Sequence, residues 1–398
     1  MQLLARICLC AGLQLATGAA SAGITAAPIY KTPYGLRIDR VAAGLAYPWG
    51  LAFLPDGRAL VTERLGRLRI IAGNGELSRP LLGVPAVYTS EEGGLLDVAA
   101  SPDFATSGLV YFSYAEPRGG GRSGTTVARA KLLPAGDRYR LEDLQVIFRQ
   151  QPSHASHAAF GSRIVFMPDG SLFITLGDRF FPRDEAQNPA NHIGKLVRIL
   201  PDGRPHPDNP RIEGWRPEIW SIGHRNVQAA AFDPATGMLW TVEHGARGGD
   251  EVNVPRPGRN YGWPVITYGR DYSNARIGVG TRRAGLEQPV YYWDPSIAPS
   301  GATFYTGELF AGWKGNLLIG ALAGQSVRRL ILDGETVVGE EVLLQEFGER
   351  IRNVRLGPDG AIWLLTDDPK GEVLRLLPAP ENGCSHGDVF FIPQAETC

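Results

Sequence analysis

A recurring turn most constrains what this chain can fold into. An apolar segment followed by Pro-Asp-Gly, or by a close relative of that tripeptide, returns along the 398-residue sequence. Proline presets the backbone of a turn, aspartate bonds its own backbone, and glycine accepts a positive φ. The clear copies lie in residues 50–57, 95–104, 163–170, 230–237 and 354–360. A diverged copy in residues 302–305 and 315–320 completes a set of six.

Each turn leads into a segment with the composition of a strand. Residues 58–63, 171–176 and 361–366 are rich in β-branched and aromatic side chains. The repeats are spaced by roughly 45–75 residues, which suits a four-stranded blade better than the sheets of a sandwich. The 50 glycines and 30 prolines argue against a mostly helical chain, because both residues interrupt helices. The sequence therefore predicts an all-β fold, a six-bladed β-propeller of four-stranded antiparallel blades.

The charge balance and the missing motifs limit the classes of function. The chain has 40 basic and 41 acidic residues, so it lacks the basic surface expected of a protein that binds nucleic acid or an anionic membrane. Any positive site must be local. The sequence contains no HExxH, P-loop or Gly-x-Ser-x-Gly motif. Residues 119–124 match Gly-x-Gly-x-x-Gly but precede a strand-like segment instead of a helix, which favours a surface loop.

The two ends of the chain are predicted to lie outside the propeller. Residues 1–22 have the pattern of a signal peptide, with Arg6, a mostly apolar run over residues 7–15 and a final Ala-Ser-Ala; a buried strand is the alternative. That run is too short to span a bilayer. Cys384 and Cys398 predict one disulfide that pins the tail, with two free thiols as the alternative. We expect a signal peptide (1–22), a propeller (23–380) and a tail (381–398) in a periplasmic or secreted protein.

Two loop segments carry residues suited to binding. Arg350 and Arg352 are expected to point to the same side of an extended segment, where two guanidiniums match a carboxylate ligand unless both pair with Asp or Glu of the protein. Residues 250–253, followed by residues 260–264, place acidic and carbonyl groups around glycine. Such oxygens suit calcium, and a solvated acidic turn is the alternative.

These segments resemble the glucose/sorbosone dehydrogenase family, the soluble quinoprotein aldose sugar dehydrogenases. The resemblance extends from residues 47–51 to residues 373–376, nearly the whole mature chain. Its most specific segments are residues 94–98, 160–166, 192–198, 223–228, 250–264 and 297–301. The family implies a six-bladed propeller that oxidises the C1 hydroxyl of an aldose to the lactone. Its cofactor is pyrroloquinoline quinone (PQQ), which carries three carboxylates, and the electrons pass to an external acceptor.

The resemblance also assigns roles to individual positions. Four side chains match cofactor-contacting residues: Arg225, Asn226, Arg350 and Arg352. Gly245 and Ala246 match positions whose backbone carbonyls hold the Ca²⁺ of the cofactor, and Glu251 and Tyr261 match a second calcium site that stabilises the fold. In the implied mechanism a histidine takes the proton of the C1 hydroxyl while hydride moves to the quinone.

Three positions depart from the family pattern, and all three belong to the implied cofactor site. Ala159 stands where the family has the histidine base, Glu92 replaces a glutamine, and Ala323 replaces a lysine. Alanine cannot accept a proton, and the other two changes disfavour a trianionic cofactor. His154 and His157 lie just upstream and are candidate substitute bases, with ordinary loop histidines as the alternative.

These departures leave two functions open at the level of the sequence. The first is an exported PQQ- and calcium-dependent dehydrogenase that acts on a small aldose. The alternative is a catalytically silent propeller of the same family that binds a carbohydrate or a protein partner through the same face. The sequence does not decide between a monomer and a homodimer.

Overall fold

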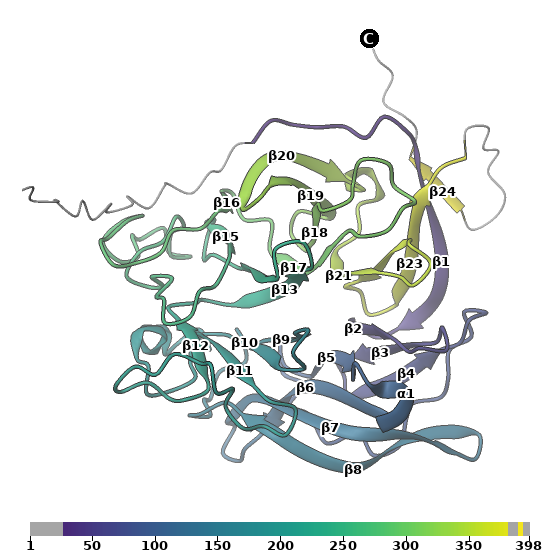
Figure 1. Ribbon diagram of the computed structural model, residues 1–398, viewed down its shortest axis with the longest axis horizontal. Coiled ribbons are helices and arrows are strands. Elements are labelled where there is room, and N and C mark those ends of the chain that lie inside the picture. Colours follow the sequence, from purple (N-terminus) through teal and green to yellow (C-terminus); the bar gives the residue numbers. More distant parts are fainter. Residues whose placement is uncertain (1–26, 381–388, 393–398) are drawn as a thin grey trace, which may run out of the picture.

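The computed structural model describes residues 27–380 and the backbone of residues 389–392. Nearly all regular structure is β, and six antiparallel sheets surround a common centre (Figure 1). The helical elements among the described residues are one turn of α-helix and two 3₁₀ turns: α1 (Phe104–Ser107), η1 (Arg183–Gln187) and η2 (Gln345–Phe347). No helix within the described ranges is long and apolar enough to cross a membrane. The predicted six-bladed β-propeller is confirmed.

The blades follow one another in chain order. The first is β2 (Pro48–Phe53), β3 (Ala59–Glu63) and β4 (Arg67–Ile71). The second is β5 (Leu95–Ala100), β6 (Leu109–Pro117), β7 (Ser123–Ala135) and β8 (Arg138–Arg149). The third is β9 (Gly161–Phe166), β10 (Leu172–Leu176), β11 (Lys195–Ile199) and β12 (Ile219–Ile222).

The remaining blades use both ends of the chain. The fourth is β13 (Val227–Asp233), β14 (Met238–Glu243), β15 (Asp250–Asn253) and β16 (Tyr291–Trp293). The fifth is β17 (Pro299–Phe304), β18 (Leu317–Ala321), β19 (Ser326–Asp333) and β20 (Thr336–Leu343). The sixth is β21 (Ile351–Leu356), β22 (Ile362–Thr366), β23 (Gly371–Pro378), β1 (Leu36–Leu45) and β24 (Val389–Ile392).

The N-terminal strand closes the ring. β1 pairs antiparallel with β23, from Leu36 opposite Pro378 to Leu45 opposite Gly371, and also with β24, so the first and last described strands share a blade. This closure refines the expected strand count, because the first blade has three described strands and the sixth has five, while the other four have four. The residues assigned to a signal peptide, and both cysteines of the tail, lie outside the described ranges.

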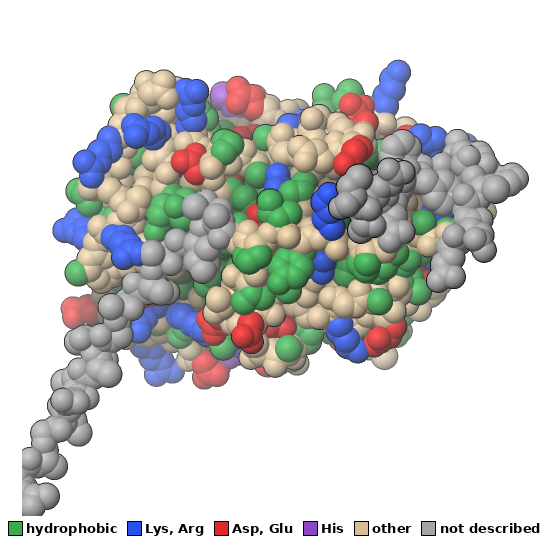
Figure 2. Space-filling model, turned by 90° about the horizontal axis from the view of Figure 1, so that it is seen from above, with side chains coloured by type: hydrophobic (Ala, Val, Ile, Leu, Met, Phe, Trp, Pro, Cys, Tyr) green, Lys and Arg blue, Asp and Glu red, His purple; other side chains and the backbone are tan. Residues whose placement is uncertain are grey.

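Apolar layers between consecutive blades form the core. Each of the six junctions holds its own cluster of buried side chains. At the junction of the fourth and fifth blades, for example, Trp240 meets Phe304 edge to face with ring centroids 5.9 Å apart. On the outside, basic and acidic side chains are interspersed in the view of Figure 2, as the balanced net charge predicts. The apolar side chains of the repeated strands are thus buried by packing one sheet against the next.

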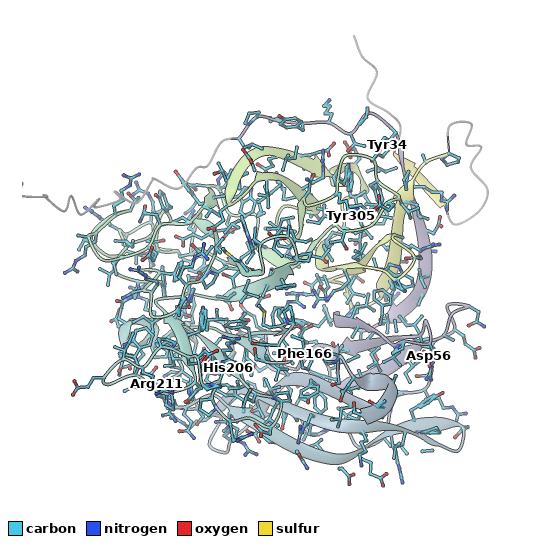
Figure 3. The ribbon with its side chains drawn as sticks, viewed as in Figure 1. Tyr34, Asp56, Phe166, His206, Arg211 and Tyr305 are labelled. Carbon is cyan, nitrogen blue, oxygen red and sulfur yellow. The ribbon has the colours of Figure 1, made fainter. Side chains whose placement is uncertain are left out.

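The six inner strands β2, β5, β9, β13, β17 and β21 line a central channel, and each contacts the next around the ring. Each begins after the loop that enters its blade and finishes in the repeated turn. We name the two ends of the channel after these features, the loop end and the turn end. Figure 3 shows Phe166, near the turn end of β9, close to the middle of the molecule, whereas Arg211 lies at its rim.

A buried guanidinium fills the middle of the channel. Arg163 pairs with Asp97 at 3.2 Å and lies over the ring of Trp49, 3.9 Å from its centroid. It also donates to three carbonyl oxygens, those of Gln228, Ser300 and Arg352. These partners come from all the other blades, so we call Arg163 and Asp97 the channel plug. Burial lowers the pKa of Arg163 to about 9.

Candidate active site

Two adjoining cavities lie at the loop end. The first, of about 370 Å³, is lined by residues that include Asp178, Arg225 and Trp263. The second, of about 550 Å³, is lined by residues that include His244 and Gly245. Both cavities are bordered by Ala246 and Tyr272. The structure thus brings together three of the predicted site residues, which are Arg225, Gly245 and Ala246.

Arg225 is the best-defined group of the site. Its Nη1 donates to the carbonyl oxygens of His244 (3.2 Å) and Gly245, and its Nη2 to the hydroxyl of Tyr272 at 3.3 Å. The guanidinium lies over Trp263, 5.3 Å from the ring centroid. Its Nε is buried and has no hydrogen-bond partner within the described structure. An unsatisfied, charged donor beside a cavity suits an anionic ligand.

Asn226 and Glu92 both contact the segment that contains Ala159. Oδ1 of Asn226 accepts a hydrogen bond from the Gly161 N–H at 3.1 Å. Oε2 of Glu92 accepts one from the Ala159 N–H at 2.8 Å. Ala159 is buried and has a positive φ of 54°. The position that the resemblance assigns to the base is therefore tied to Glu92 through its backbone, and it carries no group that could take a proton.

Arg350 and Arg352 point to the same side, and a carboxylate of the protein lies between them. Asp367 pairs with Arg350 at 3.0 Å and with Arg352 at 3.1 Å. Although burial raises the pKa of Asp367, the two guanidiniums bring it below its usual value. The alternative that these arginines pair with an acidic residue is therefore confirmed. Two cations sharing one carboxylate still leave this group of three side chains with one excess positive charge.

The segment predicted to bind calcium or to form an acidic turn is a strand. β15 contains Asp250, whose carboxylate accepts the N–H groups of Gly245 and Ile297, so the solvated turn was wrong. Glu251 lies opposite Glu243 in the adjacent strand. Burial and then the Glu243 carboxylate raise the pKa of Glu251 well above its usual range. A cation at this pair would relieve the repulsion between them.

Tyr261 has a structural role through its side chain. Its hydroxyl donates to the Val254 carbonyl at 2.8 Å and accepts the Arg256 N–H at 2.9 Å, and its ring stacks on His224. Among the described residues, no three His, Cys, Asp or Glu side chains are grouped so as to hold a metal ion. Calcium at either implied site would therefore need backbone or amide oxygens in addition to any carboxylates. The carbonyl of Gly245 fits this use, because it already accepts a cationic guanidinium.

The remaining predicted residues lie at the loop end without joining the two cavities. Ala323 is exposed in the connection between β18 and β19. Nδ1 of His157 is hydrogen-bonded to the Tyr88 hydroxyl, and the two rings are stacked. Nδ1 of His154 is buried without a partner in the described structure, and burial, followed by Arg179 and Arg122, lowers the pKa of its ring.

Sequence reasoning missed His244. Its Nε2 lies 2.6 Å from the Pro299 carbonyl oxygen, which can only accept, so Nε2 carries the hydrogen and Nδ1 the lone pair. Burial lowers the pKa of His244; Asp250 and Glu92 oppose that shift and Arg225 reinforces it. The neighbouring Gly245 was a signal for this residue, since a histidine beside an implied cofactor ligand has to approach the same site.

An aromatic rim borders the smaller cavity and was also missed. Phe180 and Tyr272 stack with ring centroids 6.2 Å apart, and Phe181 meets Phe180 edge to face. All three side chains are exposed and line the cavity. Beneath them Trp263 donates from Nε1 to the buried carboxylate of Asp178 at 2.7 Å. Burial raises the pKa of Asp178.

Comparisons with known proteins identify the family of this chain. The model of the glucose/sorbosone dehydrogenase family matches residues 45–375. Aldose sugar dehydrogenase YliI of Escherichia coli is 42% identical over 355 residues, covering 88% of this chain and 95% of that protein. A crystal structure of a glucose dehydrogenase, 48% identical, superposes with a TM-score of 0.83 over 86% of this chain and 99% of that one. The PQQ-bound aldose sugar dehydrogenase of Streptomyces coelicolor, 29% identical, gives a TM-score of 0.72 over 87% and 100%. The chain therefore belongs to the glucose/sorbosone dehydrogenase family.

Proposed function

We propose that this protein is a PQQ-dependent dehydrogenase that oxidises the C1 hydroxyl of aldose sugars to lactones. The oxidation removes two electrons and two protons from the sugar, and the electrons pass to an external acceptor. Family membership and the PQQ-bound relative support this assignment. The observation that carries it is the buried, unpartnered Nε of Arg225 beside the cavities, because such a donor calls for an anionic ligand.

Different residues of the loop end would bind different parts of the cofactor. Arg225, together with the cation excess of Arg350 and Arg352, would bind its carboxylates. The carbonyls of Gly245 and Ala246 would hold its calcium ion. When bound, PQQ supplies a quinone that accepts the hydride of the sugar. Tyr272 and the phenylalanines of the rim offer flat apolar faces against which a sugar ring can lie.

His244 is our candidate for the group that takes the proton of the C1 hydroxyl. It lines the larger cavity, its lowered pKa keeps it neutral near pH 7, and its Nδ1 makes no hydrogen bond within the described part of the chain. His157 is less suitable because Tyr88 engages its Nδ1. The pair of His244 with the Pro299 carbonyl would hold the ring in the required tautomer.

Reconstitution tests the proposal. The purified protein is loaded with calcium and PQQ, cofactor binding is followed by calorimetry, and dye reduction is measured with glucose and other aldoses. We expect binding, and slow turnover that falls further in His244→Gln. Arg225→Gln should weaken cofactor binding without unfolding the chain. Absence of cofactor binding would exclude the enzyme, and binding without turnover would indicate the silent propeller instead.

We also propose that the protein is exported, on the strength of residues 1–22. Expression of the full chain in a Gram-negative host, followed by fractionation and N-terminal sequencing, tests this. Export predicts a periplasmic or secreted product that starts near Gly23. A cytoplasmic product that retains Met1 would contradict it.

A further inference from the structure

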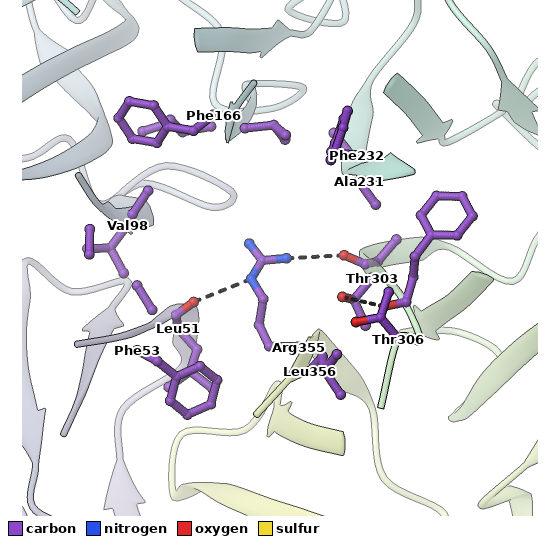
Figure 4. A pocket seen from close by; sticks show the side chains of 18 of the residues that line it. Leu51, Phe53, Val98, Phe166, Ala231, Phe232, Thr303, Thr306, Arg355 and Leu356 are labelled. Carbon is purple, nitrogen blue, oxygen red and sulfur yellow. Dashed lines mark hydrogen bonds between the residues drawn. The ribbon is translucent and has the colours of Figure 1, made fainter. Parts of the chain in front are cut away.

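A third cavity opens at the turn end, on the other side of the channel plug from the candidate active site. Its volume is about 440 Å³, within the range of small-molecule sites. All six inner strands contribute to its wall. Leu51, Val98 and Ile164 of the wall are buried, whereas Phe53, Phe166 and Phe232 are partly exposed. Figure 4 shows labelled side chains of the wall around the space.

The cavity exists because one position of the repeat is small in five blades. The equivalent residues near the ends of the inner strands are Ala52, Ala99, Val165, Ala231 and Thr303. In the sixth blade the same position is Arg355. Figure 4 shows the guanidinium of Arg355 reaching into the space that the five small residues leave. It is the only charged side chain among the described residues that line the cavity.

The contacts of Arg355 leave its charge incompletely compensated. It donates to the carbonyls of Leu51 and Ala302 at 3.3 and 3.2 Å, and to the carboxylate of Asp97 at 3.4 Å. These distances lie at the long limit for hydrogen bonds. Asp97 is also the partner of Arg163, at 3.2 Å. Two guanidiniums therefore share one carboxylate, which leaves one positive charge beside an apolar cavity.

An arginine at the inner end of an apolar cavity defines the chemistry of a ligand. The planar guanidinium matches a carboxylate in two parallel hydrogen bonds. Aromatic side chains from the first, third, fourth and fifth blades surround the space: Phe53, Phe166, Phe232 and Phe304. We propose that the turn end of the channel binds a small monocarboxylate with an aromatic or branched apolar body. The carboxylate would lie against Arg355 and the body among the phenylalanines.

This site is independent of the proposed dehydrogenase activity. The channel plug lies between the two ends, and Arg163 and Asp97 are both fully shielded from solvent. The cavity shares no lining residue with those at the loop end. A carboxylate added in solution has two possible destinations, however, because the loop end also carries arginines. The test must separate them.

Benzoate is a suitable probe, with benzyl alcohol as its neutral match. Calorimetry on the full chain should detect benzoate binding and at least tenfold weaker binding of benzyl alcohol. Arg355→Gln should weaken benzoate binding at least tenfold. Thr303→Phe should abolish it by filling the cavity, while leaving the carbonyl contacts of Arg355 in place. Thermal unfolding with and without benzoate shows that each variant is folded.

The location is tested with Arg225→Gln, which alters only the loop end. Full benzoate affinity in this variant, with loss in Thr303→Phe, would support the turn-end site. Three results would overturn it: no binding to the unaltered protein, unchanged binding in Thr303→Phe, or loss of binding in Arg225→Gln. Failure of PQQ reconstitution would leave these outcomes unaffected, because the probe needs no cofactor.

Discussion

The loop end and the turn end belong to the same six inner strands, but different residue types take the positive φ angles at each end. At the turn end, glycine takes the positive φ angles: Gly57 (85°), Gly170 (81°) and Gly360 (80°). At the loop end, residues with side chains take them as well: Ala159 (54°), Ser162 (89°) and Ala298 (52°). Each such residue costs about 1–3 kcal/mol. The repeat thus supplies a relaxed scaffold at one end, and the strain is concentrated where the site is.

The pairing of charged side chains also differs between the loop end and the turn end. At the loop end Arg350 and Arg352 share the single carboxylate of Asp367 and Arg225 keeps a buried Nε without a partner in the described structure, whereas Arg58 and Asp56 at the turn end form a simple one-to-one pair. Features that repeat from blade to blade therefore explain the fold, and features that break the repeat locate the chemistry. Arg355 is the one strong departure at the turn end, which is why its cavity is informative.

The largest expected effect is a histidine at the position that the resemblance assigns to the base. Ala159→His should raise dye reduction by the PQQ-loaded enzyme above the slow turnover expected of His244, by up to about 10²–10⁴-fold, the usual contribution of a general base. Histidine tolerates a positive φ better than most residues, so the backbone at this position can accept it. Steady-state kinetics with glucose measures the effect. Ala158→His is the matched control, and an equal gain there would contradict the placement of the base.

The channel plug should give the largest effect on stability. Asp97→Asn leaves the guanidiniums of Arg163 and Arg355 without their carboxylate, and a broken buried pair costs about 3–5 kcal/mol. Denaturant unfolding measures the change. Asp56→Asn, in the exposed pair with Arg58, should cost less than about 1 kcal/mol. Similar losses in the free energy of unfolding for the two substitutions would show that the channel plug does not stabilise the propeller.

The sequence predicted the structure of the turn end of the channel better than that of the loop end. The turn-end strands were found because Pro-Asp-Gly and the β-rich segments after it are local signals, as in residues 168–176. The pairing of β1 with β23 was not predicted, because it joins segments more than 300 residues apart and no local sequence pattern indicates it. β15 was not predicted as a strand because buried acidic strands are rare, and Asp250 is satisfied by N–H groups distant in sequence.

The site itself depended on the resemblance. Composition and spacing indicated a carboxylate site at Arg350 and Arg352, but not that Asp367 lies between them. The unpartnered Nε of Arg225 follows from its three-dimensional contacts alone. The same is true of His244, whose tautomer is set by a carbonyl in the next blade. Long-range contacts decide these features, and a single sequence does not display them.

Acid should weaken the loop end through Asp367. Its pKa is lowered in the folded state from 3.8, so its contribution to stability is complete above pH 3.8 and is lost as the pH falls through the lower folded value. The free energy of unfolding of the unaltered protein should therefore exceed that of Asp367→Asn at pH 6, and the gap should shrink below pH 3.8. Equilibrium unfolding over pH 2–6, with about five points, measures it. A gap that widens in acid would contradict the shared ion pair.

The smallest effect should come from the turn glycines. Gly170 has a φ of 81°, and an added Cβ would meet no atom within 4 Å, so strain of the backbone is the only cost. Gly170→Ala should lower the free energy of unfolding by about 1–2 kcal/mol, and Gly170→Asn by less, because asparagine visits this region readily. At the loop end, Gly161 has a similar φ of 66°, but its Cβ would lie 2.7 Å from the Thr175 carbonyl oxygen. Gly161→Ala should therefore cost more than Gly170→Ala and displace the start of β9. Equal losses in chemical denaturation would mean that the loop end is as adaptable as the turns, and that its strained backbone is not held by the surrounding blades.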